Sequence, residues 1–198
     1  MISQEGELHL AVSESVVLPI LESLTEKHLG QLVWFSQNDP DVLENTHDKD
    51  RFANVEKARE WFLDKKVYIL TDGQGENANL KGIIWFQRLP LPDGSFTSRD
   101  FNPSDYGITY AIRLYEDMRG KKLATNFTHL TMDNFMNTDY YKQSGARKIW
   151  LSVKTRTNLP GMRAYEKFGF RQISDPCEDG RILMIYDPVT EVHVGSSA

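Results

Sequence analysis

The sequence predicts an α/β fold in which helices cover the faces of a mixed, mostly antiparallel sheet. Stretches with strand-like composition come before, between and after stretches in which apolar residues recur at helical spacing. The chain has 198 residues, of which 40% are hydrophobic and 26% charged, enough apolar side chains for a packed core. Because no repeat, low-complexity run or linker-like shift in composition interrupts it, we expect one domain over residues 1–198.

The first third of the chain predicts a short strand followed by two helices. Leu8–Val12 has the composition of a strand, and Pro19–Phe35 carries apolar residues at loosely helical spacing. Val55–Phe62 repeats this spacing and predicts a helix that faces a core. The polar stretch Ser36–Arg51 between these helices is expected to be a loop.

The middle of the chain predicts a run of strands. Val67–Thr71 and Gly82–Gln87 flank a turn-rich segment and are expected to form a hairpin. Pro90–Asp105 holds three prolines and no periodicity, which predicts a long surface loop, a kind of segment that is often functional. Tyr106–Glu116 alternates in hydropathy and is expected to be the next strand.

The last third of the chain predicts two helices and three strands. A helix is expected from Leu123, and a second covers Pro160–Phe168 and ends at Gly169, since glycine commonly follows a helix C-terminus. The strands, of which the last two are expected to pair, are Ile149–Val153, Phe170–Ile173 and Ile182–Tyr186.

Composition argues against several classes of protein. The formal net charge is −5 and the isoelectric point about 5.6, whereas nucleic-acid binders are usually basic. The longest stretch without Asp, Glu, Lys or Arg is His28–Asn38, far short of the roughly 20 residues that span a bilayer. An acidic N-terminus without a signal-peptide pattern favours a cytoplasmic protein. Cys177 is the single cysteine and the five histidines are scattered, so no metal site is expected.

The most informative segment is the turn that leads from a predicted strand to the helix at Leu123. Arg119, Lys121 and Lys122 lie in or just before the first helical turn. The free N–H groups and the dipole of a helix already make this end positive, so each exposed cation there costs about 0.3–1 kcal/mol. An anion bound among them would explain the pattern, and Gly120 would allow it to approach the backbone closely. The segment therefore predicts a phosphate site.

A solvated basic turn is the alternative interpretation of the same residues. Glu116 and Asp117 precede the cations and would balance part of their charge. A nucleotide P-loop is excluded in either case, because the pattern Gly-x-x-x-x-Gly-Lys-Ser/Thr is absent.

A second group of residues lies about forty positions later. Asn158 stands where a helix begins and is a favoured N-cap, and Tyr165 follows seven residues on, nearly on the same helix face. For an isolated pair of this kind, a cap and a packed ring are the simplest interpretation.

Together and in this order, the two segments resemble the GNAT superfamily of acyl-CoA-dependent N-acyltransferases. The superfamily's pyrophosphate motif is Arg/Gln-x-x-Gly-x-Gly/Ala; Arg119 and Ala124 match it, and Lys122 stands at the first glycine, where its backbone N–H is still available. The second motif is matched at Asn158, at Tyr165-Glu166-Lys167 and at Gly169-Phe170, with Gly161 and Ala164 replacing an alanine and a leucine.

The resemblance implies a sheet with splayed middle strands and a site for acetyl-CoA, the acyl donor. Backbone groups of Ile112, Arg113 and Leu114 would lie along the pantetheine arm, and Asn158 would contact the cofactor or an ordered water. The pyrophosphate would be held by a run of backbone N–H groups, those of Arg119, Gly120, Lys121, Lys122, Leu123, Ala124 and Thr125.

The resemblance also implies direct transfer of an acetyl group to a primary amine. The Leu114 N–H would polarise the thioester carbonyl, and Tyr165 would protonate the leaving thiolate as general acid. No general base is assigned, and neither Glu22 nor Glu26 can be chosen from the sequence. The acceptor would be an amine on a small molecule or peptide, with no metal, nucleic acid or membrane involved, and the protein would be a monomer or a homodimer.

Two other functions fit parts of the same pattern. The chain could be a non-catalytic acyl-CoA-binding or sensing module on the same fold, although Tyr165 stands at the position of the family's acid. The basic turn could instead bind nucleic-acid phosphates, which the net charge of −5 disfavours.

Overall fold

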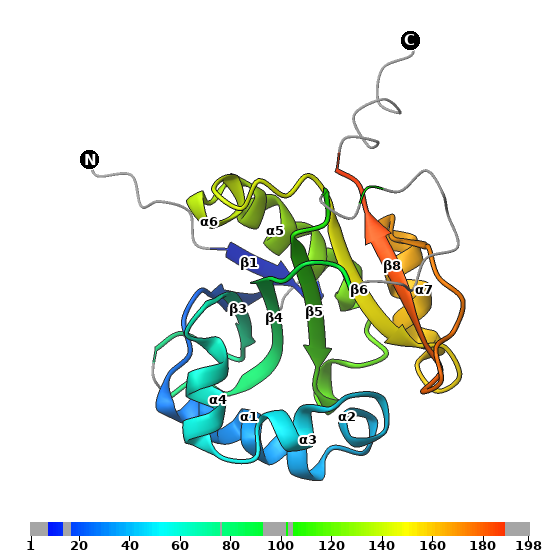
Figure 1. The fold of residues 1–198 in the computed structure, drawn as a ribbon. Helices are drawn as coiled ribbons and strands as arrows, with labels where there is room; N and C mark the ends of the chain where they lie inside the picture. The colour runs from blue at the N-terminus through cyan, green and yellow to red at the C-terminus, as the bar shows by residue number, and fades with distance from the viewer. Residues whose placement is uncertain (1–7, 14–16, 76, 93–101, 103–104, 189–198) are drawn as a thin grey trace, which may run out of the picture. The chain divides into compact units, whose positions relative to one another are not determined.

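The computed structural model describes residues 8–13, 17–75, 77–92, 102 and 105–188 (Figure 1). They form helices and a sheet of eight strands in the order β1-β2-β3-β4-β5-β6-β8-β7. The β5–β6 pair is parallel, whereas β1–β2, β2–β3, β6–β8 and β7–β8 are antiparallel. The predicted fold class, a mixed and mostly antiparallel sheet with helices, is confirmed.

The chain divides into two compact units, which are described separately. The first comprises residues 1–86 and 111–135, and the second comprises residues 87–110 and 136–198. The single domain expected from the sequence stays a prediction.

The described residues of the first unit form five strands and five α-helices, of which β4, β5 and α5 continue into the second unit. The strands are β1 (Leu8–Ala11), β2 (Val17–Leu21), β3 (Lys65–Thr71), β4 (Leu80–Arg88) and β5 (Ile108–Leu114). The helices are α1 (Glu26–Asn38), α2 (Pro40–Asn45), α3 (Asp48–Arg51), α4 (Val55–Phe62) and α5 (Leu123–Asn137).

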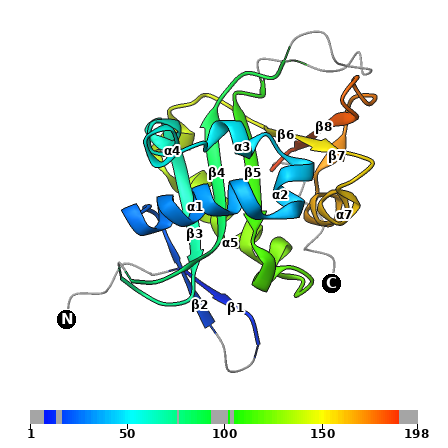
Figure 2. The ribbon, with the colours of Figure 1, turned by 90° about the horizontal axis from the view of Figure 1, so that it is seen from below.

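Alternating side chains of β3 and β4 give the first unit a core on each face of its sheet. Ile69 and Trp85 pack with apolar residues of α1, α2 and α4, and α1 runs across the strands in Figure 2. The neighbouring positions point the other way, toward α5, as the side-chain period of a strand requires. There the ring of Phe86 stacks on that of Phe135 with centroids 3.8 Å apart. The Tyr68 hydroxyl donates a hydrogen bond of 2.7 Å to Oδ1 of Asn134.

The second unit is built on β6 (Ile149–Lys154), β7 (Arg171–Gln172) and β8 (Arg181–Tyr186), with the helices α6 (Asp139–Lys142) and α7 (Leu159–Phe168). β6 and β8 pair along their whole length, from Ile149 opposite Tyr186 to Lys154 opposite Arg181. The register of β5 with β6 is short by comparison, with Ile108 opposite Ile149 and Thr109 opposite Trp150. The predicted pairing of the last two strands is confirmed.

The prediction of a helix over Pro19–Phe35 is wrong for the first residues of this range. Val17–Leu21 is the strand β2, and α1 begins only at Glu26. Pro19 lies opposite His9 in the pairing of β1 with β2. The pairing of β2 with β3 begins one residue later, at Ile20. A short apolar run does not distinguish strand from helix, and a proline weakens the strand signal further.

The loop expected over Ser36–Arg51 is also wrong, because most of this stretch is helical. It contains the end of α1, then α2 and α3. Asp39 caps α2 by accepting hydrogen bonds from the backbone N–H groups of Asp41 and Val42, and Pro40 is the first helical residue. Such an acidic cap followed by proline is a typical helix start. The helices are too short for their periodicity to show in the sequence.

Most of the expected Pro90–Asp105 loop lies outside the described residues, so its predicted surface position stays a prediction. Within the described part of the chain, no helix is both long and apolar enough to cross a membrane.

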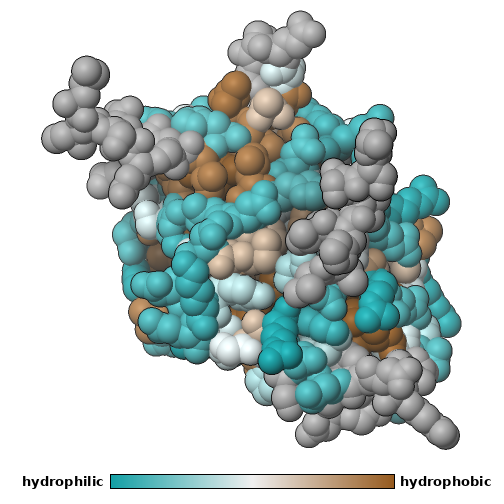
Figure 3. All heavy atoms as spheres, turned by 90° about the horizontal axis from the view of Figure 1, so that it is seen from above, coloured by the Kyte–Doolittle hydropathy of each residue, from teal (hydrophilic) through white to brown (hydrophobic). Residues whose placement is uncertain are grey.

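Hydrophobic side chains gather in one area of the face seen from above, between hydrophilic ones (Figure 3).

Candidate functional site

The turn between β5 and α5 contains two residues with left-handed backbone conformations. Gly120 has φ 73° and Lys122 has φ 59°, and Lys122 is the one residue other than glycine with positive φ in the described part of the chain. Both side chains of the pair Lys121 and Lys122 are exposed. The position that the GNAT pyrophosphate motif gives to glycine therefore has, in this chain, the backbone conformation that glycine favours.

Helix α5 begins at Leu123, directly after the two lysines. Leu123 is buried, so its side chain serves the core, while Ala124 and Thr125 are partly exposed in the first helical turn. The first N–H groups of a helix have no partner within it and point out of its N-terminus. The turn thus offers backbone donors and two exposed cations at one place.

Arg119, the third predicted cation, is held by protein oxygens instead of being free. Its Nε donates to the Leu114 carbonyl at 2.9 Å, Nη2 lies 2.5 Å from Asp39 Oδ2, and Nη1 lies 2.7 Å from Asp41 Oδ2. Each guanidinium nitrogen therefore has a partner within the first unit. The expected set of three exposed cations is reduced to two.

A second arginine on β5 has the same kind of environment. Arg113 donates to the carboxylate of Asp48 through Nε at 2.7 Å and Nη2 at 3.1 Å, and to the Ile112 carbonyl through Nη1 at 2.8 Å. Asp48 is buried and also accepts from Arg51 at 2.7 Å. Burial opposes its ionisation, but the two arginines outweigh this, so the pKa of Asp48 lies below its ordinary value.

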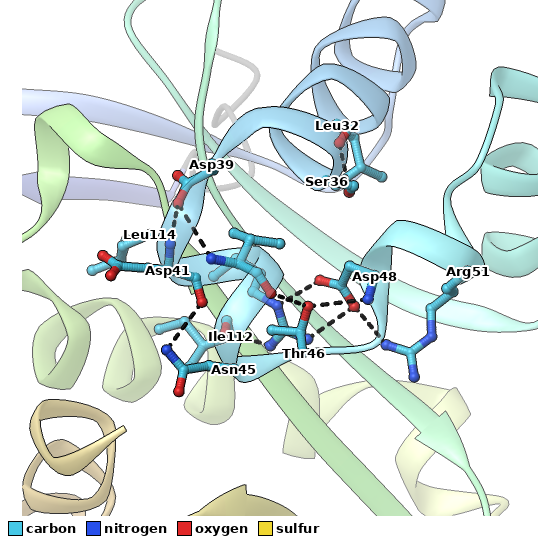
Figure 4. A network of polar contacts seen from close by, with 12 residues as sticks. Leu32, Ser36, Asp39, Asp41, Asn45, Thr46, Asp48, Arg51, Ile112 and Leu114 are labelled. Carbon is cyan, nitrogen blue, oxygen red and sulfur yellow. Dashed lines mark hydrogen bonds and ion pairs between the residues drawn. The ribbon is translucent and has the colours of Figure 1, made fainter. Parts of the chain in front are cut away.

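These contacts form one polar network around the ends of α1, α2 and β5. Figure 4 shows Asp39 and Asp48 at the starts of the two short helices, near Ile112 and Leu114 on the strand. Sequence reasoning missed both aspartates because it interpreted their surroundings as loop. The signal that could have identified Asp39 is its place before Pro40, the N-cap pattern.

The direction of the Leu114 N–H follows from the strand beside it. The backbone N–H of Tyr115 donates a hydrogen bond of 3.0 Å to the carbonyl of Lys81, a residue of β4 that precedes Gly82. Successive N–H groups of an extended strand point to opposite sides, so the N–H of Leu114 points away from β4. Gly82 allows the two strands to approach closely, because a Cβ there would lie 3.0 Å from the Arg113 carbonyl oxygen.

The acidic residues considered from the sequence have structural partners. Asp117 pairs with Lys81 at 2.6 Å, which lowers the pKa of its carboxyl. Glu26 pairs with Arg59 at 2.7 Å, and Glu22 pairs with Lys66.

In the described part of the chain, no group of three His, Cys, Asp or Glu side chains is arranged to hold a metal ion.

The second motif lies in the second unit, at the two ends of α7. Asn158 is the N-cap, and its side chain accepts from the Gly161 N–H at 3.1 Å. The Tyr165 ring is partly exposed and packs edge-on against Tyr110 and Phe170, with centroids 6.2 Å and 5.9 Å away. The expected end of the helix at Gly169 is confirmed, with φ 115°. The cap and the packed ring expected from the simplest interpretation are therefore both present.

Comparison with solved structures assigns the fold. The chain has the GNAT fold, and aligned structures include the aminoglycoside acetyltransferase AAC(6')-Ib in complex with ribostamycin and coenzyme A (TM-score 0.61, 18% identity, covering 90% of this chain and 98% of that one). Others are the GNAT domain of S. lividans PAT (0.61, 13%, 91% and 96%) and ribosomal-protein-S5-alanine acetyltransferase from Vibrio fischeri (0.59, 13%, 91% and 97%). No protein-family model and no curated protein matches the sequence.

Proposed function

We propose that this protein is an N-acetyltransferase that moves the acetyl group of acetyl-CoA to a primary amine. The observation that carries the proposal is the turn before α5, where two left-handed residues and two exposed lysines precede a helix N-terminus on a GNAT fold. Several aligned structures are acetyltransferases crystallised with coenzyme A or acetyl-CoA, which supports the same donor here.

The residues of this turn fit a pyrophosphate. A helix N-terminus attracts anions through its free N–H groups and dipole, and the exposed Lys121 and Lys122 add two positive charges. The net charge of −5 does not oppose this, since the positive potential is local to the turn. Lys121 and Lys122, with the N–H groups from Gly120 to Thr125, would hold the phosphates.

The end of β5 would hold the acyl arm. The β5–β6 register is at Ile108 and Thr109, and the backbone further along, from Ile112 to Leu114, is proposed to line the pantetheine. The outward direction of the Leu114 N–H supports its role as the donor that stabilises negative charge on the thioester oxygen.

In the proposed reaction, a neutral amine attacks the thioester carbon, so a C–N bond forms and the C–S bond breaks. The amine, with an ordinary pKa near 10.4, loses a proton to solvent, since no base is assigned. The departing thiolate takes a proton, and a phenol with a pKa of about 10 can supply it. Tyr165 is proposed for this step because it stands at the position of the family's acid.

The acceptor is proposed to be a primary amine on a small molecule or a peptide. Aligned acetyltransferases of this fold were solved with aminoglycosides, and another is named for a ribosomal protein, so the fold serves both kinds of acceptor.

Binding of acetyl-CoA is the first test. Thermal unfolding and calorimetric titration should show stabilisation of the wild type, about 2.7 kcal/mol at a ligand concentration of 100 Kd. Lys121→Glu should lose most of this stabilisation, whereas the matched charge reversal Lys57→Glu, at an exposed position on α4, should keep it. Arg119 is a poorer choice, since reversing its charge would leave Asp39 and Asp41 unpaired.

Turnover is tested next by measuring thiol release from acetyl-CoA with a panel of primary amines. Release that depends on an amine supports the enzyme. Tight acetyl-CoA binding without release across the panel would support the non-catalytic module instead. Failure of well-folded protein to bind at millimolar acetyl-CoA would contradict both.

A further inference from the structure

Two arginines cap the carbonyl groups of alternate residues on β5. Arg113 donates to the Ile112 carbonyl at 2.8 Å, and Arg119 donates to the Leu114 carbonyl at 2.9 Å. Carbonyls of residues two apart lie on the same side of an extended strand. The register of β5 with β6 is at Ile108 and Thr109. Further along the strand, the two arginines donate to carbonyls to which the N–H groups of a neighbouring strand would otherwise donate.

Buried carboxylates hold both arginines in place. Asp48 receives two hydrogen bonds from Arg113, and Asp39 receives one from Arg119 at 2.5 Å. Asp39 divides its oxygens between two tasks, since Oδ1 caps α2 while Oδ2 contacts Arg119. Each carbonyl is thus tied through an arginine to the start of a short helix.

These contacts bracket the peptide unit that carries the Leu114 N–H. The peptide unit before it is fixed through the Ile112 carbonyl. The peptide unit after it is fixed by two hydrogen bonds, one to the Leu114 carbonyl and one from the Tyr115 N–H to the Lys81 carbonyl. The arginines also offset the partial negative charge of two carbonyls that lie on the same side of the strand as this N–H. A developing oxyanion beside the N–H would otherwise be repelled by them.

We propose that Asp39 and Asp48, acting through Arg119 and Arg113, are positioning residues that aim the Leu114 N–H at the thioester oxygen. Arg119 accordingly serves the strand and not the pyrophosphate, the role given to it by the sequence motif. This inference rests on the proposed function, because it concerns the oxyanion donor of that reaction.

Asp39→Asn separates the two possible roles of Arg119. Asparagine is also a good N-cap, so α2 keeps its cap while the carboxylate that holds Arg119 is lost. If Arg119 contacted the pyrophosphate, removing a neighbouring negative charge would tighten acetyl-CoA binding. If it positions β5, binding changes by less than about threefold and the polarisation of the carbonyl decreases.

The readout is the infrared stretching frequency of the thioester carbonyl in bound, ¹³C-labelled acetyl-CoA, measured beside the Kd from calorimetry. We expect binding to wild type to lower the frequency, and Asp39→Asn to lose at least half of this shift. Arg119→Lys, which keeps the charge near Asp39 but loses the fork that reaches Leu114, should lose it as well. This second variant tests the inference even if the first does not fold.

Lys121→Gln is the matched comparison for a residue that holds phosphate. It should raise the Kd and weaken its dependence on salt, while the carbonyl shift of the bound ligand stays as in wild type. The inference is overturned if Arg119→Lys or Asp39→Asn keeps the full carbonyl shift, or if Asp39→Asn tightens binding; acetyl-CoA binding by the wild type then leaves the proposed function standing. If the wild type does not bind acetyl-CoA, the proposed function fails and this inference fails with it.

Discussion

Gly120 and Lys122 lie on either side of Lys121, and both have left-handed backbone conformations, with φ of 73° and 59°. Glycine adopts this conformation freely, whereas a residue with a Cβ pays about 1–2 kcal/mol for it. Lys122→Gly should therefore raise the free energy of unfolding by about 0.5–1 kcal/mol, after allowing for the greater chain entropy of glycine. Urea denaturation of wild type and variant measures the difference.

Lys121→Gly is the control for that substitution. Lys121 is exposed in the same turn but has no positive φ, so glycine there should lower the free energy of unfolding by about 0.5–1 kcal/mol. An equal loss of unfolding free energy in the two variants would show that the left-handed conformation of Lys122 is not strained.

The turn also shows how far the sequence predicts the site. Charge and glycine placement predict an anion site before α5, which stays a prediction, and the sequence motif places Lys122 at the glycine position, where the structure has a left-handed backbone. The partners of Arg119 could not be predicted, because Asp39 and Asp41 are about eighty residues away in the sequence. Ion pairs over such distances depend on tertiary packing, which no local pattern encodes.

The fold was predicted best where elements are long or bounded by strong signals. The helix ending at Gly169 and the strands of the middle region were recognised from periodicity and turn residues. The strand β2 and the helices α2 and α3 were missed, because four to six residues carry too little periodicity to distinguish helix, strand and loop. Asp39 caps the first of these helices and Asp48 begins the second, so the proposed positioning network was missed with them.

His28 should make stability depend on pH. It is fully buried at the start of α1, where Nδ1 accepts from the Thr25 N–H at 3.2 Å and Nε2 lies 3.2 Å from the Ala78 carbonyl oxygen. This arrangement suits the neutral ring, with its proton on Nε2. Burial lowers the pKa of His28 below its ordinary value of 6.5. The unfolded chain therefore binds a proton more readily, and stability falls as the pH drops below about 6.5.

His28→Gln should flatten this dependence between about pH 7 and pH 5. Glutamine at this position can complete the capping box with Thr25, as the histidine does, but it does not titrate. Thr25→Ala is the comparison, since it removes the side-chain cap and should lower stability by about 1 kcal/mol at every pH. An unchanged slope in His28→Gln would exclude His28 as the source.

Gly82→Ala should disturb the end of β5. A Cβ at this position would lie 2.8 Å from Cδ2 of Leu114 and 3.0 Å from the Arg113 carbonyl oxygen, so the strand must shift. We expect a loss of about 1–3 kcal/mol in the free energy of unfolding, and a smaller polarisation of bound thioester. Gly30→Ala is the matched control, because a Cβ there meets nothing within 4 Å on helix α1 and should stabilise the protein.

Tyr165→Phe tests the general acid directly. Phenylalanine keeps the ring that packs against Tyr110 and Phe170, so the fold and the Kd for acetyl-CoA should stay close to wild type. Turnover with an amine found in the thiol-release screen should fall by about 10²- to 10⁴-fold, the usual contribution of a positioned acid.

The pH profile distinguishes this role from a structural one. A phenol that must donate its proton loses that ability as it ionises, so wild-type turnover should decline at high pH, and the variant should lack this decline. A merely structural tyrosine would change the rate equally at all pH values. Full activity of Tyr165→Phe at every pH would exclude Tyr165 as the acid and leave protonation of the thiolate to solvent.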